Sequence, residues 1–185
     1  MHAALSDVVF DLFQNSIEAG AMNIGVSFWE TADEIHFSVT DDGRGMDFEG
    51  LKRAEDPFGS DGTKHPGRRV GLGIPFLRQT AEQTGGRVEI DSVPGKGTRI
   101  EAVFPAAHLD LPPEGNLVLL WLQCLTFGGD YQLKIHRMCR ESDGRVEEYR
   151  IDKAEISEAL GGLEDTNTVG LLREFLESME EPFNK

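Results

Sequence analysis

The chain has 185 residues, of which 39% are hydrophobic and 28% charged, an ordinary composition for one globular domain with a small addition. Its 33 acidic and 18 basic residues give a net charge of −15, so we expect it to bind neither nucleic acid nor an anionic membrane. The longest apolar run, Leu117–Leu122, is too short to span a bilayer, and the first residues lack the features of a signal peptide, which predicts a cytoplasmic protein.

The first predicted element is an amphipathic helix that starts after Ser6, as N-cap, and ends at Gly20. Its apolar stripe consists of Val9, Leu12, Phe13, Ser16 and Ile17. Asp11, Asn15 and Glu18 lie on the opposite stripe. Taken alone, these three polar residues could be a solvated helix face or the front of a binding site.

Two strands are predicted next, because apolar residues alternate over residues 24–28 and 35–39. The second strand runs into a tight glycine turn, Asp41–Gly45, and a short helix is expected around Phe48–Ala54. Residues 55–70 are rich in Gly, Pro and charge without periodicity, which predicts a long loop that is either functional or disordered.

The helix that follows opens at Gly71–Ile74 and continues to about Thr84, with Pro75 tolerated in its first turn. Residues 87–91 and 98–104 form a predicted hairpin. We therefore divide the chain into a domain over residues 1–105, a connector over 106–113 and a small α/β unit over 114–185.

The C-terminal unit is predicted to contain a helix, a hairpin and two further helices. These elements are expected over Asn116–Thr126, Tyr131–Arg140, Arg145–Ile151, Lys153–Leu160 and Val169–Met179. The two cysteines, Cys124 and Cys139, form no CxxC and lie near no His pair, so no zinc site is predicted.

The order and spacing of the motifs resemble the GHKL, or Bergerat-fold, ATPases. Asp11–Ala21 resembles the N box of that superfamily, Asp41–Met46 its G1 box, residues 55–70 its lid, Gly71–Ile74 its G2 box and Gly95–Thr98 its closing GxGT hairpin. The first box is most similar to MutL, and the second half of the domain to a histidine kinase. The resemblance implies an α/β two-layer sandwich followed by the small C-terminal unit.

The resemblance also implies a role for single residues in binding ATP with Mg²⁺. Asn15 corresponds to the amide that ligates Mg²⁺, and Asp41 to the carboxylate that accepts a hydrogen bond from the adenine amino group. Thr98 is similar to the threonine that supports this carboxylate. Lys64 is the expected cation over the γ-phosphate. Asp11 stands where MutL has the glutamate that activates water, and its side chain is one methylene shorter, which predicts slow hydrolysis.

The remaining candidate nucleotide contacts lie in the two glycine motifs, where a missing Cβ lets the backbone approach a ligand and a helix N-terminus favours anions. They are Gly43, Gly45, Met46, Gly71, Leu72 and Gly73. Glu18 is the alternative carboxylate to Asp11.

Three functions are compatible with this resemblance. The chain could be a slow ATPase or ATP-dependent switch acting on a protein partner, a serine kinase of the anti-sigma type, or a non-hydrolysing ATP sensor. No histidine has the helical setting of a phosphoacceptor, so we expect no phosphoacceptor domain. The pattern from Asn116 to Met179 is similar to GHKL proteins found beside iron hydrogenase and NADH-oxidising subunits, which implies a redox-enzyme partner. A homodimer is a further option.

Overall fold

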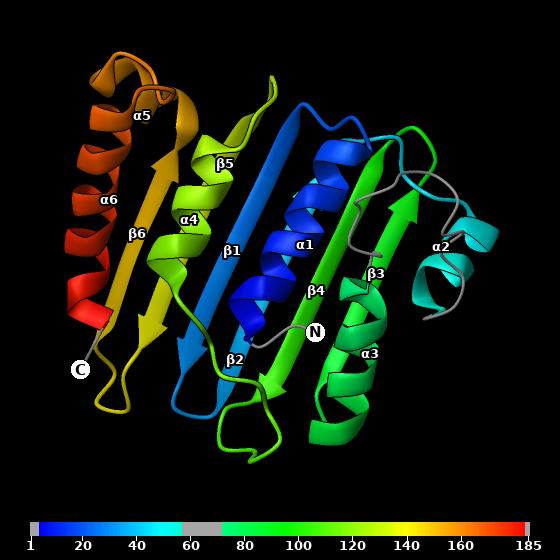
Figure 1. Ribbon diagram of the computed structural model, residues 1–185. Helices are drawn as coiled ribbons and strands as arrows, with labels where there is room; N and C mark the ends of the chain where they lie inside the picture. The colour runs from blue at the N-terminus through cyan, green and yellow to red at the C-terminus, as the bar shows by residue number, and fades with distance from the viewer. Residues whose placement is uncertain (1–3, 57–71, 184–185) are drawn as a thin grey trace.

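The computed structural model describes residues 4–56 and 72–183 of the chain. One six-stranded sheet carries the helices (Figure 1). The helices are α1 (Leu5–Glu18), α2 (Phe48–Glu55), α3 (Gly73–Thr84), α4 (Leu117–Thr126), α5 (Lys153–Leu160) and α6 (Thr166–Glu180), followed by the 3-10 turn Glu181–Phe183. The strands are β1 (Asn23–Thr31), β2 (Glu34–Asp41), β3 (Arg87–Val93), β4 (Gly97–Pro105), β5 (Gln132–Arg140) and β6 (Val146–Asp152).

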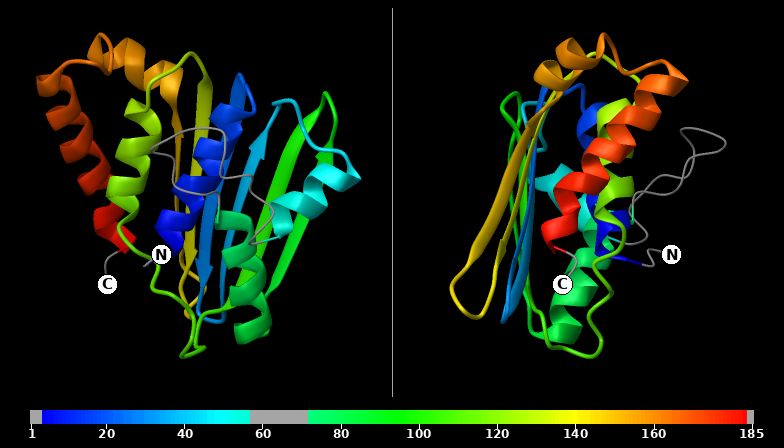
Figure 2. Two further views of the ribbon diagram at one scale, coloured as in Figure 1. Left: turned by 45° about the vertical axis from the view of Figure 1, so that its right-hand side comes forward. Right: turned by 90° about the vertical axis from the view of Figure 1, so that its left-hand side faces the viewer.

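The strand order across the sheet is β3-β4-β2-β1-β5-β6. Neighbouring strands are antiparallel except β1 and β5, which run parallel. Seen edge-on, the long helices lie on the same side of the sheet (Figure 2). The alternation of apolar and polar side chains along the strands explains why the helices cover one face. Val26 and Phe28 of β1 are buried toward the helices, while Ser27 between them is only half-buried on the other face. The predicted two-layer α/β sandwich is therefore confirmed.

Helix α1 lies across the middle of the sheet and buries its apolar stripe, including Leu12 and Phe13. The predicted N-cap at Ser6 is wrong, since the N-cap is Ala4 and the helix begins at Leu5, two residues earlier than expected. The segment that precedes α4 supplies the acceptors that a capping side chain would otherwise provide. The N–H groups of Leu5 and Ser6 donate to the carbonyls of Pro113 and Glu114, both at 2.8 Å.

The C-terminal elements extend the sheet and the core of the preceding part of the chain. Strand β5 pairs with β1 along its whole length, and α4 packs beside α1 on the same face. Trp121 of α4 and Leu172 of α6 are fully buried in the same hydrophobic cluster as Phe13. Sheet and core are thus continuous across the predicted connector, and the division of the chain into two units stays a prediction.

A buried charge cluster joins the C-terminal elements to the rest of the domain. Arg137 of β5 is 2% exposed and contacts three carboxylates. Its Nη2 lies 2.5 Å from Glu30 of β1 and 3.3 Å from Glu114, which precedes α4, and its Nε lies 3.7 Å from Glu180 of α6. Because three acidic groups surround one cation, a proton on one of them lowers the repulsion within the cluster.

The cluster makes the stability of the domain depend on pH through Glu114. Burial, followed by the hydrogen bond and negative charge of Glu30, raises the pKa of the Glu114 carboxyl to about 9. A raised folded-state pKa contributes stability that is complete below the unfolded pKa, near 4.5, and is lost as pH rises through the folded value. The wild type should therefore lose unfolding free energy more steeply with rising pH than Glu114→Gln across this window.

Urea unfolding of both proteins at several pH values between those two limits measures this effect. Glutamine keeps the size and neutrality of the protonated acid, so the two proteins should be similar in stability at the acidic end. The glutamine variant should become relatively more stable at the alkaline end. Parallel pH dependences would contradict the assignment of the proton to Glu114.

Within the described residues, none of the helices has both the length and the apolar character that crossing a membrane requires.

Candidate functional site

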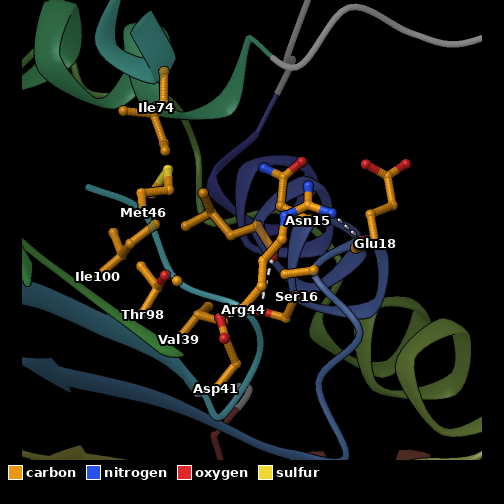
Figure 3. Close-up of a pocket in the computed structure, with 14 residues that line it drawn as sticks. Asn15, Ser16, Glu18, Val39, Asp41, Arg44, Met46, Ile74, Thr98 and Ile100 are labelled. Carbon is orange, nitrogen blue, oxygen red and sulfur yellow. Dashed lines mark hydrogen bonds between the residues drawn. The ribbon is translucent and has the colours of Figure 1, made fainter. Parts of the chain in front are cut away.

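A pocket of about 210 Å³ opens between the C-terminal half of α1 and the ends of β2 and β4 (Figure 3). Its wall also includes the turn after β2, one residue of α2 and one of α3. The lining residues are Leu12, Asn15, Ser16, Glu18, Ala19, Val39, Asp41, Arg44, Gly45, Met46, Ala54, Ile74, Thr98 and Ile100. Five residues expected at the site from the sequence therefore line one pocket: Asn15, Asp41, Gly45, Met46 and Thr98.

Asp41, at the end of β2, is held in a fixed orientation inside the pocket. Its Oδ1 accepts the backbone N–H of Gly43 at 2.9 Å, and its Oδ2 accepts the hydroxyl of Ser16 at 2.8 Å. A carboxylate has about four lone-pair sites, so two hydrogen bonds leave acceptor capacity for a ligand. The site thus offers a preoriented acceptor at its inner end.

Ser16 is a pocket residue that was not predicted at the site, because it was assigned to the apolar stripe of the first helix. The residue is 3% exposed and lies on the face of α1 that packs on the sheet. A hydroxyl on a buried helical stripe needs a partner, and that polar exception is the signal that could have identified it. The partner is Asp41, 25 residues further along the chain.

The glycine turn after β2 packs closely against neighbouring backbone. Gly45 has φ +63°, and a Cβ there would lie 2.1 Å from the carbonyl oxygen of Val93. A Cβ on Gly43 would lie 2.8 Å from the Cβ of Ala19, at the end of α1. Any side chain at these positions would push the turn away from α1 or from the β3–β4 hairpin, and would therefore reshape the pocket.

Met46 and Thr98 are connected through a third side chain, Ser92 of β3. The backbone N–H of Met46 donates to Ser92 Oγ at 2.8 Å, and the hydroxyls of Ser92 and Thr98 are 2.9 Å apart. Thr98 is also the cross-strand partner of Asp41 in the β2–β4 register. The register places Thr98 beside the carboxylate that it was expected to support.

Asn15 and Asp11 lie one turn apart on α1, at the side that faces α3. Asn15 lines the pocket, whereas Asp11 lies outside the lining and contacts the first turn of α3. Asp11 Oδ2 accepts the backbone N–H of Gly73 at 2.9 Å, and a Cβ on Gly73 would lie 2.6 Å from the same oxygen. The structure therefore brings the two glycine motifs and the polar stripe of α1 to one region.

The remaining predicted contacts differ in their outcome. Leu72 occupies the N-cap position of α3, is 38% exposed and does not line the pocket. Lys64 and Gly71 lie outside the described residues, as does most of the predicted loop 55–70. Glu18, the alternative carboxylate, lines the pocket.

The donor set suits a magnesium ion that is shared with a ligand. Among residues 4–56 and 72–183, no group of three or more His, Cys, Asp or Glu side chains could hold a metal by itself. Asn15 offers one amide oxygen in the pocket, and Mg²⁺ commonly takes one or two protein ligands together with waters and substrate phosphates. The residues present fit an ion that arrives with a phosphorylated ligand.

Comparison with known proteins identifies a family. The sequence profile described as histidine kinase-, DNA gyrase B-, and HSP90-like ATPase matches residues 2–108, more than half of the chain. Sporulation kinase C of Bacillus subtilis is 35% identical over 103 residues, which are 55% of this chain and 23% of that protein. The sensor histidine kinase ZraS of Escherichia coli O157:H7 is 31% identical over 113 residues, 60% of this chain and 24% of the relative. The chain spans about a quarter of the length of these relatives.

Two solved structures show looser similarity. The N-terminal domain of a DNA repair protein has a TM-score of 0.47 at 14% identity, with 80% of this chain and 52% of that chain covered. The catalytic domain of the histidine kinase ThkA has a TM-score of 0.41 at 24% identity, with 54% of this chain and 64% of that chain covered.

Proposed function

Because the chain belongs to the family of histidine kinase-, DNA gyrase B- and HSP90-like ATPases, we propose that its pocket binds ATP together with Mg²⁺. The chain is an ATP-binding domain of the type found in histidine kinases. We further propose that it works as a slow ATPase or an ATP-dependent conformational switch that acts on a protein partner. A redox enzyme is the class of partner that we propose.

The observation that carries this proposal is the fixed carboxylate of Asp41 in the same pocket as the amide of Asn15. A carboxylate accepts a hydrogen bond from the amino group of adenine, whereas guanine presents a carbonyl at the equivalent position and would meet repulsion. Ser16 and Gly43 hold Asp41 from both sides, so little reorganisation is needed when the base enters. We expect ATP to be preferred over GTP for this reason.

The other end of the pocket suits the phosphates. Asn15 would hold the magnesium ion, which neutralises phosphate charge when it is bound. Helix α3 begins beside this end of the pocket, and a helix N-terminus favours anions. Such local devices are needed, since the chain as a whole is strongly acidic and repels a polyanion.

Asp11 is the proposed general base for hydrolysis. Its carboxylate lies beside the first turn of α3, where the terminal phosphate is expected, and would accept a proton from the attacking water. The same carboxylate accepts the N–H of Gly73. A base that is also engaged in a structural hydrogen bond is consistent with slow turnover.

Asp11→Asn should separate binding from hydrolysis. We expect ATP affinity within about threefold of the wild type and phosphate release lowered on the order of 100-fold, since the base is lost while the side-chain size is kept. Calorimetric titration with ATP and a phosphate-release assay measure the two quantities. Asp33→Asn is the matched control, because Asp33 is exposed in the β1–β2 turn, at the opposite end of β2 from the pocket. Unchanged phosphate release in Asp11→Asn would exclude Asp11 as the base.

Titration of the purified chain with ATP and GTP in the presence of Mg²⁺ tests the proposed function itself. ATP binding with steady phosphate release supports the ATPase or switch. Transfer of labelled phosphate to a serine of an added partner would identify a kinase of the anti-sigma type instead, and ATP binding without turnover would identify a sensor. Absence of ATP binding would contradict the proposal.

A further inference from the structure

Arg44 occupies a distinctive position in the pocket. Among the described residues that line it, Arg44 is the single cation, and Asp41 and Glu18 are the acidic groups. The net charge of −15 opposes the approach of any polyanionic ligand. A cation in the pocket therefore lowers the electrostatic repulsion of such a ligand at the place where it would bind.

The backbone of Arg44 is fixed on both sides. Its N–H donates to the carbonyl of Ala19 at 3.0 Å, and its own carbonyl accepts the N–H of Gly95 at 2.8 Å. One contact ties the turn to the end of α1 and the other ties it to the β3–β4 hairpin. The position of the Cα is therefore set by the fold, and the long side chain is the part that can move.

The side chain of Arg44 crosses the pocket from the turn toward α1. Figure 3 shows its guanidinium next to Asn15 and Glu18, away from the inner end that Asp41 marks. Its Nη1 lies 3.4 Å from the carbonyl oxygen of Glu18, which is long for a hydrogen bond between a charged donor and an oxygen. Such a contact on an exposed side chain is easily exchanged for a stronger one.

We propose that Arg44 contacts the phosphate chain of the bound nucleotide and so distinguishes adenine nucleotides from adenosine. This inference rests on the proposed function, because it places the base at Asp41 and the phosphates at Asn15. The guanidinium already lies at the Asn15 end, and its planar donors match phosphate oxygens better than they match the single carbonyl of Glu18. Breaking the Glu18 contact makes the donors available to the ligand.

A different role for Arg44 would be to stabilise the C-terminal end of α1, where a cation interacts favourably with the helix dipole and the free carbonyls. The two roles differ in how they depend on the ligand. A helix-stabilising residue would affect binding of adenosine, ADP and ATP alike, because it would act through the shape of the pocket. A phosphate contact would matter only when phosphates are present.

Calorimetric titrations of the wild type, Arg44→Ala and Arg44→Lys with adenosine, ADP and ATP test the proposal. We expect Arg44→Ala to weaken ATP binding about tenfold or more and adenosine binding less than twofold, as the loss of one charge-assisted hydrogen bond predicts. Arg44→Lys keeps the charge without the planar donors and should recover part of the loss. Arg87→Ala removes the same charge from the 68% exposed side chain of the edge strand β3 and should leave all three affinities unchanged.

The outcomes separate the inference from the proposed function. Wild-type protein that fails to bind ATP would overturn both. Wild-type protein that binds ATP, combined with an equal loss for adenosine and ATP in Arg44→Ala, would overturn the role of Arg44 alone. An ATP affinity of Arg44→Ala within twofold of the wild type would do the same, and thermal unfolding of each variant verifies that it is folded.

Discussion

Asp41→Asn is expected to lower the affinity for ATP on the order of 100-fold. The asparagine still fits between Ser16 and Gly43, but its NH₂ group would face the amino group of adenine, so that two donors meet. The expected loss of affinity is large, because the unpaired polar groups of the site and the ligand would remain buried without a hydrogen-bond partner. Calorimetric titration with ATP measures the loss, and circular dichroism verifies the fold.

Ser16→Ala provides a graded version of the same change. The alanine leaves Asp41 Oδ2 without the hydroxyl that orients it, while the carboxylate itself stays in place. We expect a loss of ATP affinity of about tenfold, between the wild type and Asp41→Asn. Asp33→Asn again serves as control, and ATP affinities of Asp41→Asn close to those of the wild type would exclude Asp41 as the adenine acceptor.

Asn15→Ala is expected to remove the dependence of ATP binding on magnesium. In the wild type, Mg²⁺ should strengthen ATP binding on the order of 100-fold, since the ion would connect the amide oxygen to the phosphates. Without that amide, titrations with Mg²⁺ and with a chelator should give nearly equal affinities. In the chelator, wild type and variant should agree, because the contacts to the base are intact in both.

Gln14→Ala is the matched control for this second experiment. Gln14 is the preceding residue of α1, carries the same amide group and does not line the pocket. Its replacement should leave the magnesium effect unchanged. An undiminished magnesium effect in Asn15→Ala would contradict the assignment of Asn15 as the metal ligand.

Local patterns determined much of the secondary structure in advance. The alternation in residues 24–28 and 35–39 predicted β1 and β2, and the predicted helix Lys153–Leu160 has the bounds of α5. Such patterns depend on neighbours within about four residues, which the sequence displays directly. The helical spacing of Asp11 and Asn15 likewise placed them on one stripe of α1, and the resemblance of the glycine motifs indicated which residues surround a nucleotide.

Contacts between segments that are distant along the chain could not be predicted from such local patterns. Ser16 appeared as a member of an apolar stripe until the structure placed Asp41 opposite it, and the start of α1 depends on the carbonyl of Pro113. Arg137 and the carboxylates around it come from two strands, a helix and the segment that precedes α4. A local sequence pattern predicts none of these partners, because each pair is separated by many residues along the chain.

The sequence by itself determined the amphipathic first helix, because periodicity is a property of short stretches of chain. The class of fold and the candidate ATP site followed from the resemblance of its motifs to a known family. Only the tertiary structure decided that β5 joins β1 in parallel, that Asp11 meets the N–H of Gly73, and that Arg44 reaches across the pocket toward Asn15. The physical reason is that such contacts depend on how the helices pack on the sheet. Packing brings together residues that are far apart along the chain, and their sequence separation does not predict which of them will be in contact.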